Sequence, residues 1–352
     1  MLRKLTAALA LSLMAFAAPA EAAPKKSFNV AWTIYVGWMP WQYAAENGIV
    51  KKWADKYGID IKFTQLNDYV ESINQFTAGK FDAVGLTNMD GLTIPAAGGV
   101  DTTLLIVGDF SNGNDGIVSK TAKSIPDLKG ESINLVELSV SHYLLARALD
   151  MSGMSEQDVK VVNTSDADIA SAYKSPDVTH VVTWNPMLAE VKAEPGTTEL
   201  FDSSKIPGEI IDCLAVNTET LKDNPDFGKA LTGIWYETLA LMSGDGDKAR
   251  EAKTAMAKAS GTDLAGFEAQ LRGTRLFSDP AEAVALIQSP DVVKTMELVR
   301  TFSFDHGLLG EGAKSKDVVG IGFPGGKTLG DANNVKLRFD STYAKMAADG
   351  KL

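Results

Sequence analysis

The residues best suited to hold a small solute follow the ends of several expected strands. They are Tyr35, Trp38, Trp41, Thr87, Asn88, Asp90, Glu137, Ser139, His142, Trp184, Asn185 and Asp212. Ligands of open α/β sheets bind beyond the carboxyl ends of the strands, so we expect these side chains to meet. No Lys or Arg stands at any of these strand ends. Indole rings with unopposed carboxylates suit a small cation, through cation–π contacts and charge-assisted hydrogen bonds.

A flat, delocalised cation fits this set of side chains best. The N–H groups of guanidinium would meet carboxylates edge-on while its face stacks on indole. Neutral urea could use the same edges, but it would leave buried carboxylates uncompensated, at a cost of several kcal/mol for each charge. An anion site would leave helix N-termini bare or add an Arg, whereas here Asp90, Glu137 and Asp212 occupy those positions.

Each of these residues also has a structural interpretation. Trp38 and Trp41, three apart, could pack a helix onto the sheet, and Asp90 could be an N-cap. Asp212 could stabilise a crossing between lobes. Ser139 is a natural capping residue, and His142 could be a structural histidine. Glu137, at an otherwise apolar strand end, is the residue hardest to explain by packing alone.

Catalytic motifs are missing from the sequence. His142, His180 and His306 are scattered, with no Cys or carboxylate at metal-ligand spacing, and neither HExxH nor CxxC occurs. A nucleophile elbow of the form G-x-S-x-G and a phosphate-binding GxxxxGK[ST] are also missing. The stretch 320–325 formally matches G-x-G-x-x-G, but its internal proline and the short remaining chain favour a loop. We expect no metal, no cofactor and no enzymatic activity.

The N-terminus and the composition point to an exported protein. Residues 1–22 have a basic start, an apolar run and a small-residue cleavage site, which predicts a signal peptide cleaved before Ala23. Cys213, the only cysteine, cannot form an internal disulfide, and we expect it to be buried. The net charge of −11 argues against nucleic acid or an anionic membrane surface as partner.

Short apolar runs alternate with helical patterns along the chain, which predicts parallel sheets with helical crossovers. Residues 23–113 form the first part of lobe 1, residues 114–213 form an inserted lobe 2, and residues 214–352 return to lobe 1 with a helical region. The turn-rich segment 111–116 and the strand-like segment 211–217 are the expected crossings. Two strands that join two α/β lobes form a hinge.

The runs YVGWMPWQYA, NDYVESINQFTAGKFDAVGLTNMD, LLIVGDFSNGNDG and THVVTWNP resemble a known family. The mature chain is similar to periplasmic solute-binding proteins of ABC importers of the nitrate/sulfonate/taurine type. Within them it resembles the urea-carboxylase-associated branch, which handles urea or guanidine. The resemblance implies the two-lobed periplasmic-binding-protein fold (type II), a periplasmic location and a membrane permease as partner. Where sulfonate-type relatives carry a Gly-Ser turn, this chain has Glu137-Leu138-Ser139, which disfavours an anion.

The leading hypothesis is therefore a non-enzymatic, monomeric periplasmic receptor that traps guanidinium between its lobes for delivery to a permease. The first alternative keeps the receptor and changes the solute to urea or another neutral amide. Sulfonate, taurine or nitrate binding ranks lower. An envelope enzyme that uses His142 as a base is the remaining alternative, and it lacks a nucleophile–base pair.

Overall fold

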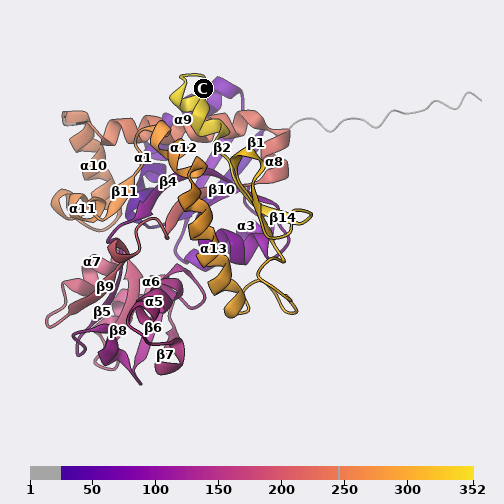
Figure 1. Ribbon diagram of the computed structural model, residues 1–352. Helices are drawn as coiled ribbons and strands as arrows, with labels where there is room; N and C mark the ends of the chain where they lie inside the picture. Colours follow the sequence, from indigo (N-terminus) through magenta and orange to yellow (C-terminus); the bar gives the residue numbers. More distant parts are fainter. Residues whose placement is uncertain (1–24, 245) are drawn as a thin grey trace, which may run out of the picture.

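The computed structural model describes residues 25–244 and 246–352, so the predicted signal peptide lies outside the described residues. The chain forms two α/β lobes, each a sheet with helices packed against it (Figure 1). This arrangement confirms the predicted fold class. Of the helices in the described ranges, none combines the length and the apolar character that a membrane crossing needs.

The sheet of lobe 1 has nine strands, in the order β13-β12-β14-β4-β10-β3-β1-β2, with β11 paired to β4. Strand β1 pairs in parallel with β2 and β3, while β10 is antiparallel to both β3 and β4. The strands are β1 (Ser27–Thr33), β2 (Asp60–Leu66), β3 (Ala83–Thr87), β4 (Thr102–Ser111), β10 (Ile211–Asn217), β11 (Thr274–Leu276), β12 (Gly320–Gly322), β13 (Thr328–Leu329) and β14 (Val335–Phe339).

Helices of lobe 1 pack on this sheet or on one another through their apolar faces. Pro40 lies in the first turn of α1, and Gly58 ends α2 in the left-handed conformation that glycine adopts readily. The α-helices are α1 (Met39–Glu46), α2 (Ile49–Tyr57), α3 (Tyr69–Thr77), α4 (Asn88–Gly91), α8 (Thr218–Asp223), α9 (Pro225–Met242), α10 (Asp247–Ala259), α11 (Leu264–Leu271), α12 (Pro280–Gln288), α13 (Pro290–Asp305) and α14 (Thr342–Ala348). Shorter helices are η1 (Val36–Trp38), η2 (Leu92–Ala96) and η6 (Pro324–Gly326).

Lobe 2 has a five-stranded sheet in the order β7-β6-β8-β5-β9, where β6 is parallel to β7 and β8, and β5 is antiparallel to its neighbours. The strands are β5 (Asp115–Ser119), β6 (Ser132–Leu135), β7 (Lys160–Asn163), β8 (His180–Trp184) and β9 (Thr198–Asp202). The helices are α5 (Val140–Met151), α6 (Asp166–Lys174), α7 (Met187–Lys192), η3 (Ile125–Leu128), η4 (Glu156–Asp158) and η5 (Ser203–Lys205).

The chain crosses between the lobes at residues 112–114 and 203–210, between strands of different sheets. The first crossing lies within the segment 111–116. The segment 211–217 differs: it forms β10, inside the sheet of lobe 1, so the return crossing precedes the expected boundary at residue 213. Apolar residues in β10 do not alternate with polar ones, as is typical of a strand that is buried on both faces.

The lobes are in contact, so the structure represents a closed arrangement. The Ser165 hydroxyl donates to Asp68 Oδ2 at 2.9 Å, and the Tyr69 amide donates to Asp166 Oδ1 at 3.1 Å. Near the hinge, the Val36 amide donates to the Asn185 carbonyl at 3.3 Å. These bonds bring the strand ends of the two sheets face to face.

Candidate functional site

A small cavity lies where the strand ends of the two lobes meet. Its volume is about 20 Å³, counted as space open to the centre of a water molecule. A sphere of this volume has a radius of roughly 1.7 Å. Adding the radius of a water molecule, about 1.4 Å, gives the space that atoms can fill, a sphere of about 3 Å radius, which holds about four heavy atoms. Both lobes line it, through Tyr35, Trp38, Tyr69, Thr87, Asp115, Val140, Trp184, Ile210 and Asp212. Within the described residues, this lining includes no Lys, Arg or His.

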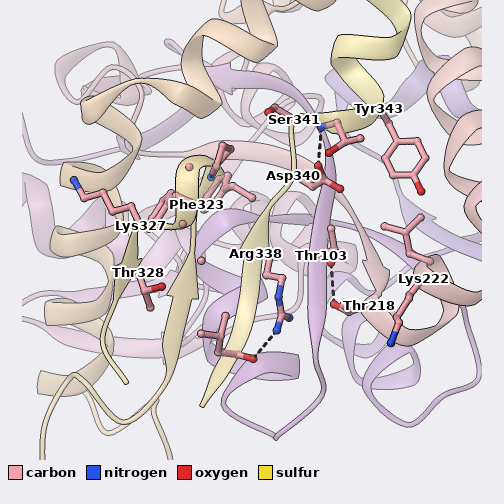
Figure 2. Close-up of a pocket in the computed structure, with 18 of the residues that line it drawn as sticks. Thr103, Thr218, Lys222, Phe323, Lys327, Thr328, Arg338, Asp340, Ser341 and Tyr343 are labelled. Carbon is pink, nitrogen blue, oxygen red and sulfur yellow. Dashed lines mark hydrogen bonds between the residues drawn. The ribbon is translucent and has the colours of Figure 1, made fainter. Parts of the chain in front are cut away.

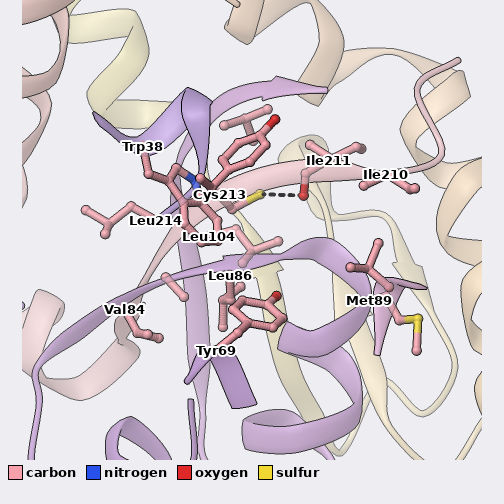
Figure 3. Close-up of a cluster of buried hydrophobic side chains, with 14 of the residues drawn as sticks. Trp38, Tyr69, Val84, Leu86, Met89, Leu104, Ile210, Ile211, Cys213 and Leu214 are labelled. Carbon is pink, nitrogen blue, oxygen red and sulfur yellow. Dashed lines mark hydrogen bonds between the residues drawn. The ribbon is translucent and has the colours of Figure 1, made fainter. Parts of the chain in front are cut away.

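Aromatic rings form the walls of the cavity. Trp38 meets Tyr35 edge-on, with ring centroids 5.1 Å apart, and lies 6.1 Å from Tyr69. Tyr69 in turn meets the edge of Trp184, from lobe 2, at 5.6 Å. Figure 3 shows Trp38 and Tyr69 on either side of the buried residues Leu86 and Cys213. The rings therefore extend the apolar core to the cavity, where a flat solute would contact them.

Two aspartates line the cavity, one from the sheet of each lobe. Asp115 is the first residue of β5, and Asp212 belongs to β10. Both are buried, with exposed fractions of 3% and 4%. Burial raises the pKa of Asp115 to about 7; the Ser111 hydrogen bond lowers it, and the nearby charge of Asp90 adds to the rise. A buried carboxylate without a cationic partner has this signature.

A third aspartate, Asp109, stands beside Asp212. The two are direct partners in the antiparallel pairing of β4 with β10, so their side chains share one face. Burial raises the pKa of Asp109 to about 7, although hydrogen bonds with Tyr35 and Asp212 lower it. Burial together with the charges of Asp109 and Asp115 raises the pKa of Asp212 as well. The Asp109–Asp212 pair therefore retains a proton at neutral pH when no cation is near.

Tyr35 connects this pair to the cavity wall, since its hydroxyl donates to Asp109 Oδ1 at 2.8 Å. Oδ2 of Asp109 and Oδ2 of Asp212 are buried, and apart from the proton that the pair retains they have no hydrogen-bond donor in the described residues. Gly37 is required here, because a Cβ at its position would lie 2.6 Å from Asp109 Oδ2. The site thus has buried acceptor oxygens that a ligand with N–H groups could satisfy.

Asp90 lies behind the wall of the cavity. It accepts from the Tyr69 hydroxyl at 2.7 Å and from the Thr87 hydroxyl at 2.8 Å. Burial raises its pKa to about 6, against the lowering effect of these bonds and of the Val140 amide. Asp90 also belongs to the first turn of α4, where Thr87 is the N-cap. It therefore orients Tyr69 and Thr87 while adding to the negative charge of the site.

Of the residues singled out in the sequence, the structure brings five to the cavity: Tyr35, Trp38, Thr87, Trp184 and Asp212. The others lie elsewhere. Trp41 packs between Trp235 and Phe63, at 4.7 and 5.2 Å, in the core under α1. Asn88 bridges to the return crossing, where its Oδ1 accepts from the Ile211 amide.

Four further predicted residues, all from lobe 2, lie outside the cavity. Glu137 is exposed in the turn after β6. Ser139 is the N-cap of α5, and Asn185 Oδ1 accepts from the Ala189 amide in the first turn of α7. His142 hydrogen-bonds to Glu156 rather than to the cavity, which removes the base that an enzymatic interpretation would use.

Sequence reasoning missed Tyr69, Asp109, Asp115, Val140 and Ile210. Tyr69 reads as the start of an amphipathic helix, and Asp115 belongs to the turn-forming segment 111–116 of the sequence although it begins β5 in the structure. Asp109 offered a signal, because a lone carboxylate interrupts the apolar run of β4. Such an interruption in a buried strand indicates a functional group.

A larger groove of about 700 Å³ lies on lobe 1 alone and is lined by residues of α8, β14 and the segment 322–328 (Figure 2). Arg338 is paired there with Asp101, and Asp340 Oδ1 accepts from the Thr342 amide at 2.6 Å. The glycine-rich stretch 320–325 forms β12 and the start of η6, so the first half of it is a strand rather than the expected loop. This groove contains aromatic rings such as Phe323 and Phe339, but none of the charged residues that line it is buried.

Two α/β lobes joined by two crossings and closed on a small cavity define the fold of periplasmic binding proteins. The structure resembles the alkanesulfonate-binding protein SsuA of Xanthomonas axonopodis pv. citri, at a TM-score of 0.68 and 16% identity, over 82% of this chain and 96% of that one. It also resembles the nitrate-binding protein NrtA of Synechocystis PCC 6803, at a TM-score of 0.58 and 12% identity, over 93% and 99% of the two chains.

The family is shown by sequence. The NMT1/THI5-like family model matches residues 39–240, more than half of the chain, and the protein belongs to this family. A Brucella abortus (strain 2308) protein described only as a binding protein is 26% identical over 241 residues, which are 66% of this chain and 71% of that protein.

Proposed function

We propose that the protein is the solute-binding component of an ABC importer and that its solute is guanidinium. One observation carries the proposal: three buried aspartates, Asp109, Asp115 and Asp212, gather at a cavity whose lining, among the described residues, has no positive charge. A bound cation would compensate them. The family and the two-lobed fold support the receptor role.

Size and shape favour guanidinium among cations. Its four heavy atoms match the small cavity, and its six coplanar N–H groups can donate to oxygens on opposite walls. Asp115 and Asp212 approach from different sheets, and Trp38 and Trp184 offer ring surface from the two lobes. Cation–π contact in a desolvated site contributes about 2 kcal/mol or more.

The rival solutes fit the charge less well. Urea has nearly the same outline, but as a neutral molecule it would leave the Asp115 carboxylate without a counter-charge. Sulfonate and nitrate, the solutes for which two of the structural neighbours are named, would add negative charge to a site that already has an excess of it. Guanidinium alone among these solutes removes the electrostatic cost of the empty cavity.

Capture and delivery follow from the two-lobed architecture. The solute enters between open lobes, contacts both, and so stabilises only the closed form, which a membrane permease then recognises. The proposal includes export to the periplasm by the N-terminal leader, action as a monomer, and a place in the urea-carboxylase-associated branch of the family. No catalytic step is part of it.

Calorimetric titration of the purified protein with guanidinium chloride, urea, nitrate and taurine at micromolar to millimolar concentrations tests the proposal. Denaturation by guanidinium requires molar amounts, so these concentrations isolate specific binding. We expect saturable binding of guanidinium and none of the two anions. Tighter binding of urea would replace the proposed solute with a neutral amide, and binding of either anion without guanidinium would refute the charge argument.

A further inference from the structure

A second cluster of chemically capable side chains lies between the lobes, away from the cavity. His142 belongs to α5 and Glu156 to η4, both in lobe 2, while His306 directly follows α13 of lobe 1. Nε2 of His142 contacts Oε1 of Glu156, and Nε2 of His306 contacts Oε2 of the same carboxylate. Figure 1 shows why this is possible: α13 extends from lobe 1 toward lobe 2.

The three side chains form a donor set that metals use. The candidate ligand atoms all lie within 4.8 Å of one another. Two imidazole nitrogens and one carboxylate are typical of three-ligand Zn²⁺ sites that keep an open position for water. The side chains of Glu156 and His306 are 26% and 20% exposed, so an ion can reach the cluster from solvent.

His306 is already oriented as a ligand. Its Nδ1 lies 2.8 Å from the Phe302 carbonyl oxygen, an arrangement that holds a proton on Nδ1, so a metal ion would displace only the Nε2 proton that the ring now donates to Glu156. The ring also stacks on Phe302 with centroids 4.0 Å apart. This backbone contact and this packing fix the ring position, as the outer shell of a metal ligand does.

His142 needs one local rearrangement, and the backbone is strained where it would occur. The Leu138 amide now donates to Nδ1 of His142 at 3.1 Å, which places the imidazole proton on Nε2. Leu138 has a φ of 61°, unusual for a residue with a branched side chain. A flip of the Glu137–Leu138 peptide would turn the Glu137 carbonyl toward Nδ1–H and bring φ to about −120°, in the extended region. Metal binding and relief of strain thus require the same movement.

We propose that His142, Glu156 and His306 bind a divalent transition-metal ion, with Zn²⁺ as the preferred ion, and that this ion links the two lobes in the closed form. Because His306 comes from the other lobe, opening removes one of the three ligands. Metal affinity and lobe closure are then thermodynamically coupled, and metal binding must favour closure by the amount that closure favours metal. The proposal does not depend on the identity of the solute.

The test compares metal binding by the chelator-treated wild type and by the variants His306→Ala and His142→Ala. Zn²⁺ is titrated calorimetrically, and Co²⁺ provides a visible ligand-field band that reports nitrogen coordination. We expect 1:1 binding by the wild type and a loss of about 100-fold or more in affinity, with loss of the band, in each variant. Glu219→Gln, an exposed carboxylate on α8, is the matched control and should bind like the wild type.

A second measurement tests the link between lobes. Small-angle scattering of the solute-free wild type should show a smaller radius of gyration with Zn²⁺ than with chelator, and His306→Ala should show no change. Metal binding that survives His306→Ala, or the absence of 1:1 binding by the folded wild type, would overturn the proposal. Guanidinium titrations in the presence of chelator are independent of this site, so failure here is distinguishable from failure of the proposed function.

Discussion

Asp212→Asn should stabilise the ligand-free protein and weaken its binding of guanidinium. The substitution keeps the size of the side chain and removes one carboxylate from the Asp109–Asp212 pair, whose members are direct cross-strand partners. Two such charges at about 4 Å in a medium of effective dielectric near 20 repel by about 4 kcal/mol. The free energy of unfolding should therefore rise by up to about 2–4 kcal/mol once the pH is high enough to ionise both carboxyl groups, and by less while the pair keeps its proton.

The effect depends on pH, because both carboxyl groups of the pair have a raised pKa. At pH 5 the pair already holds a proton, so Asp212→Asn should change the stability by little. Binding should suffer at both pH values, since a hydrogen bond to a charged group contributes about 1.5–3 kcal/mol, equivalent to about 10- to 100-fold in affinity. Scanning calorimetry at pH 5 and 8 and calorimetric titration of guanidinium measure the two effects.

The matched control is Asp177→Asn, an exposed aspartate of lobe 2, which should alter neither quantity. The reasoning fails if Asp212→Asn binds guanidinium as tightly as the wild type. It also fails if the variant is less stable than the wild type at pH 8 while keeping its fold, because the carboxylate would then be a net stabilising group.

Three further predictions use the same methods. Burial raises the pKa of Asp109 and Asp115 to about 7 from 3.8, so their contribution to stability is complete below about pH 4 and is lost as pH rises through 7. The melting temperature of the ligand-free protein should therefore fall from pH 5 to pH 8. Millimolar guanidinium should raise the melting temperature more at pH 8 than at pH 5. Trp184→Ala should weaken guanidinium binding by about 10-fold or more through loss of ring contact, measured by titration, with circular dichroism as the check on folding. Glu137→Gln, in contrast, should leave the affinity within about twofold of the wild type, because this side chain is exposed outside the cavity; a large loss would place Glu137 in the site.

The rule that ligands lie at strand ends explains which residues of the cavity the sequence could indicate. Tyr35, Thr87 and Trp184 directly follow or end strands that run toward the hinge, and the alternation of strands and helices was enough to place them together. The two-lobed fold followed from the same alternation.

The rule misses residues of antiparallel strands, whose amino ends can reach the same edge. Asp115 begins β5, which runs antiparallel to β8, so its amino end lies beside the carboxyl end marked by Trp184. Asp109 faces Asp212 only because β10 returns between β3 and β4, a pairing that no local pattern reveals. Glu137, conversely, follows strand β6, but the turn in which it lies exposes its side chain to solvent, away from the cavity.

The histidine cluster shows the same limit over a longer range. Glu156 is 14 residues from His142 and 150 from His306, so no ligand spacing is visible in the sequence. Only the length and direction of α13 bring His306 to lobe 2. The absence of a metal motif in the sequence therefore does not decide whether the fold builds a metal site.

The position of the carboxylates suggests how charge could control closure. Asp115 belongs to the sheet of lobe 2 and Asp212 to that of lobe 1, and the charge of Asp115 disfavours ionisation of Asp212 across the cleft. When both are ionised, closing the empty lobes brings like charges together and removes water from them, which costs free energy. A cation between them reverses the sign of this interaction, whereas a neutral solute leaves it unchanged and an anion increases it. Under the proposed function, the same repulsion keeps the empty receptor open and selects the solute that closes it.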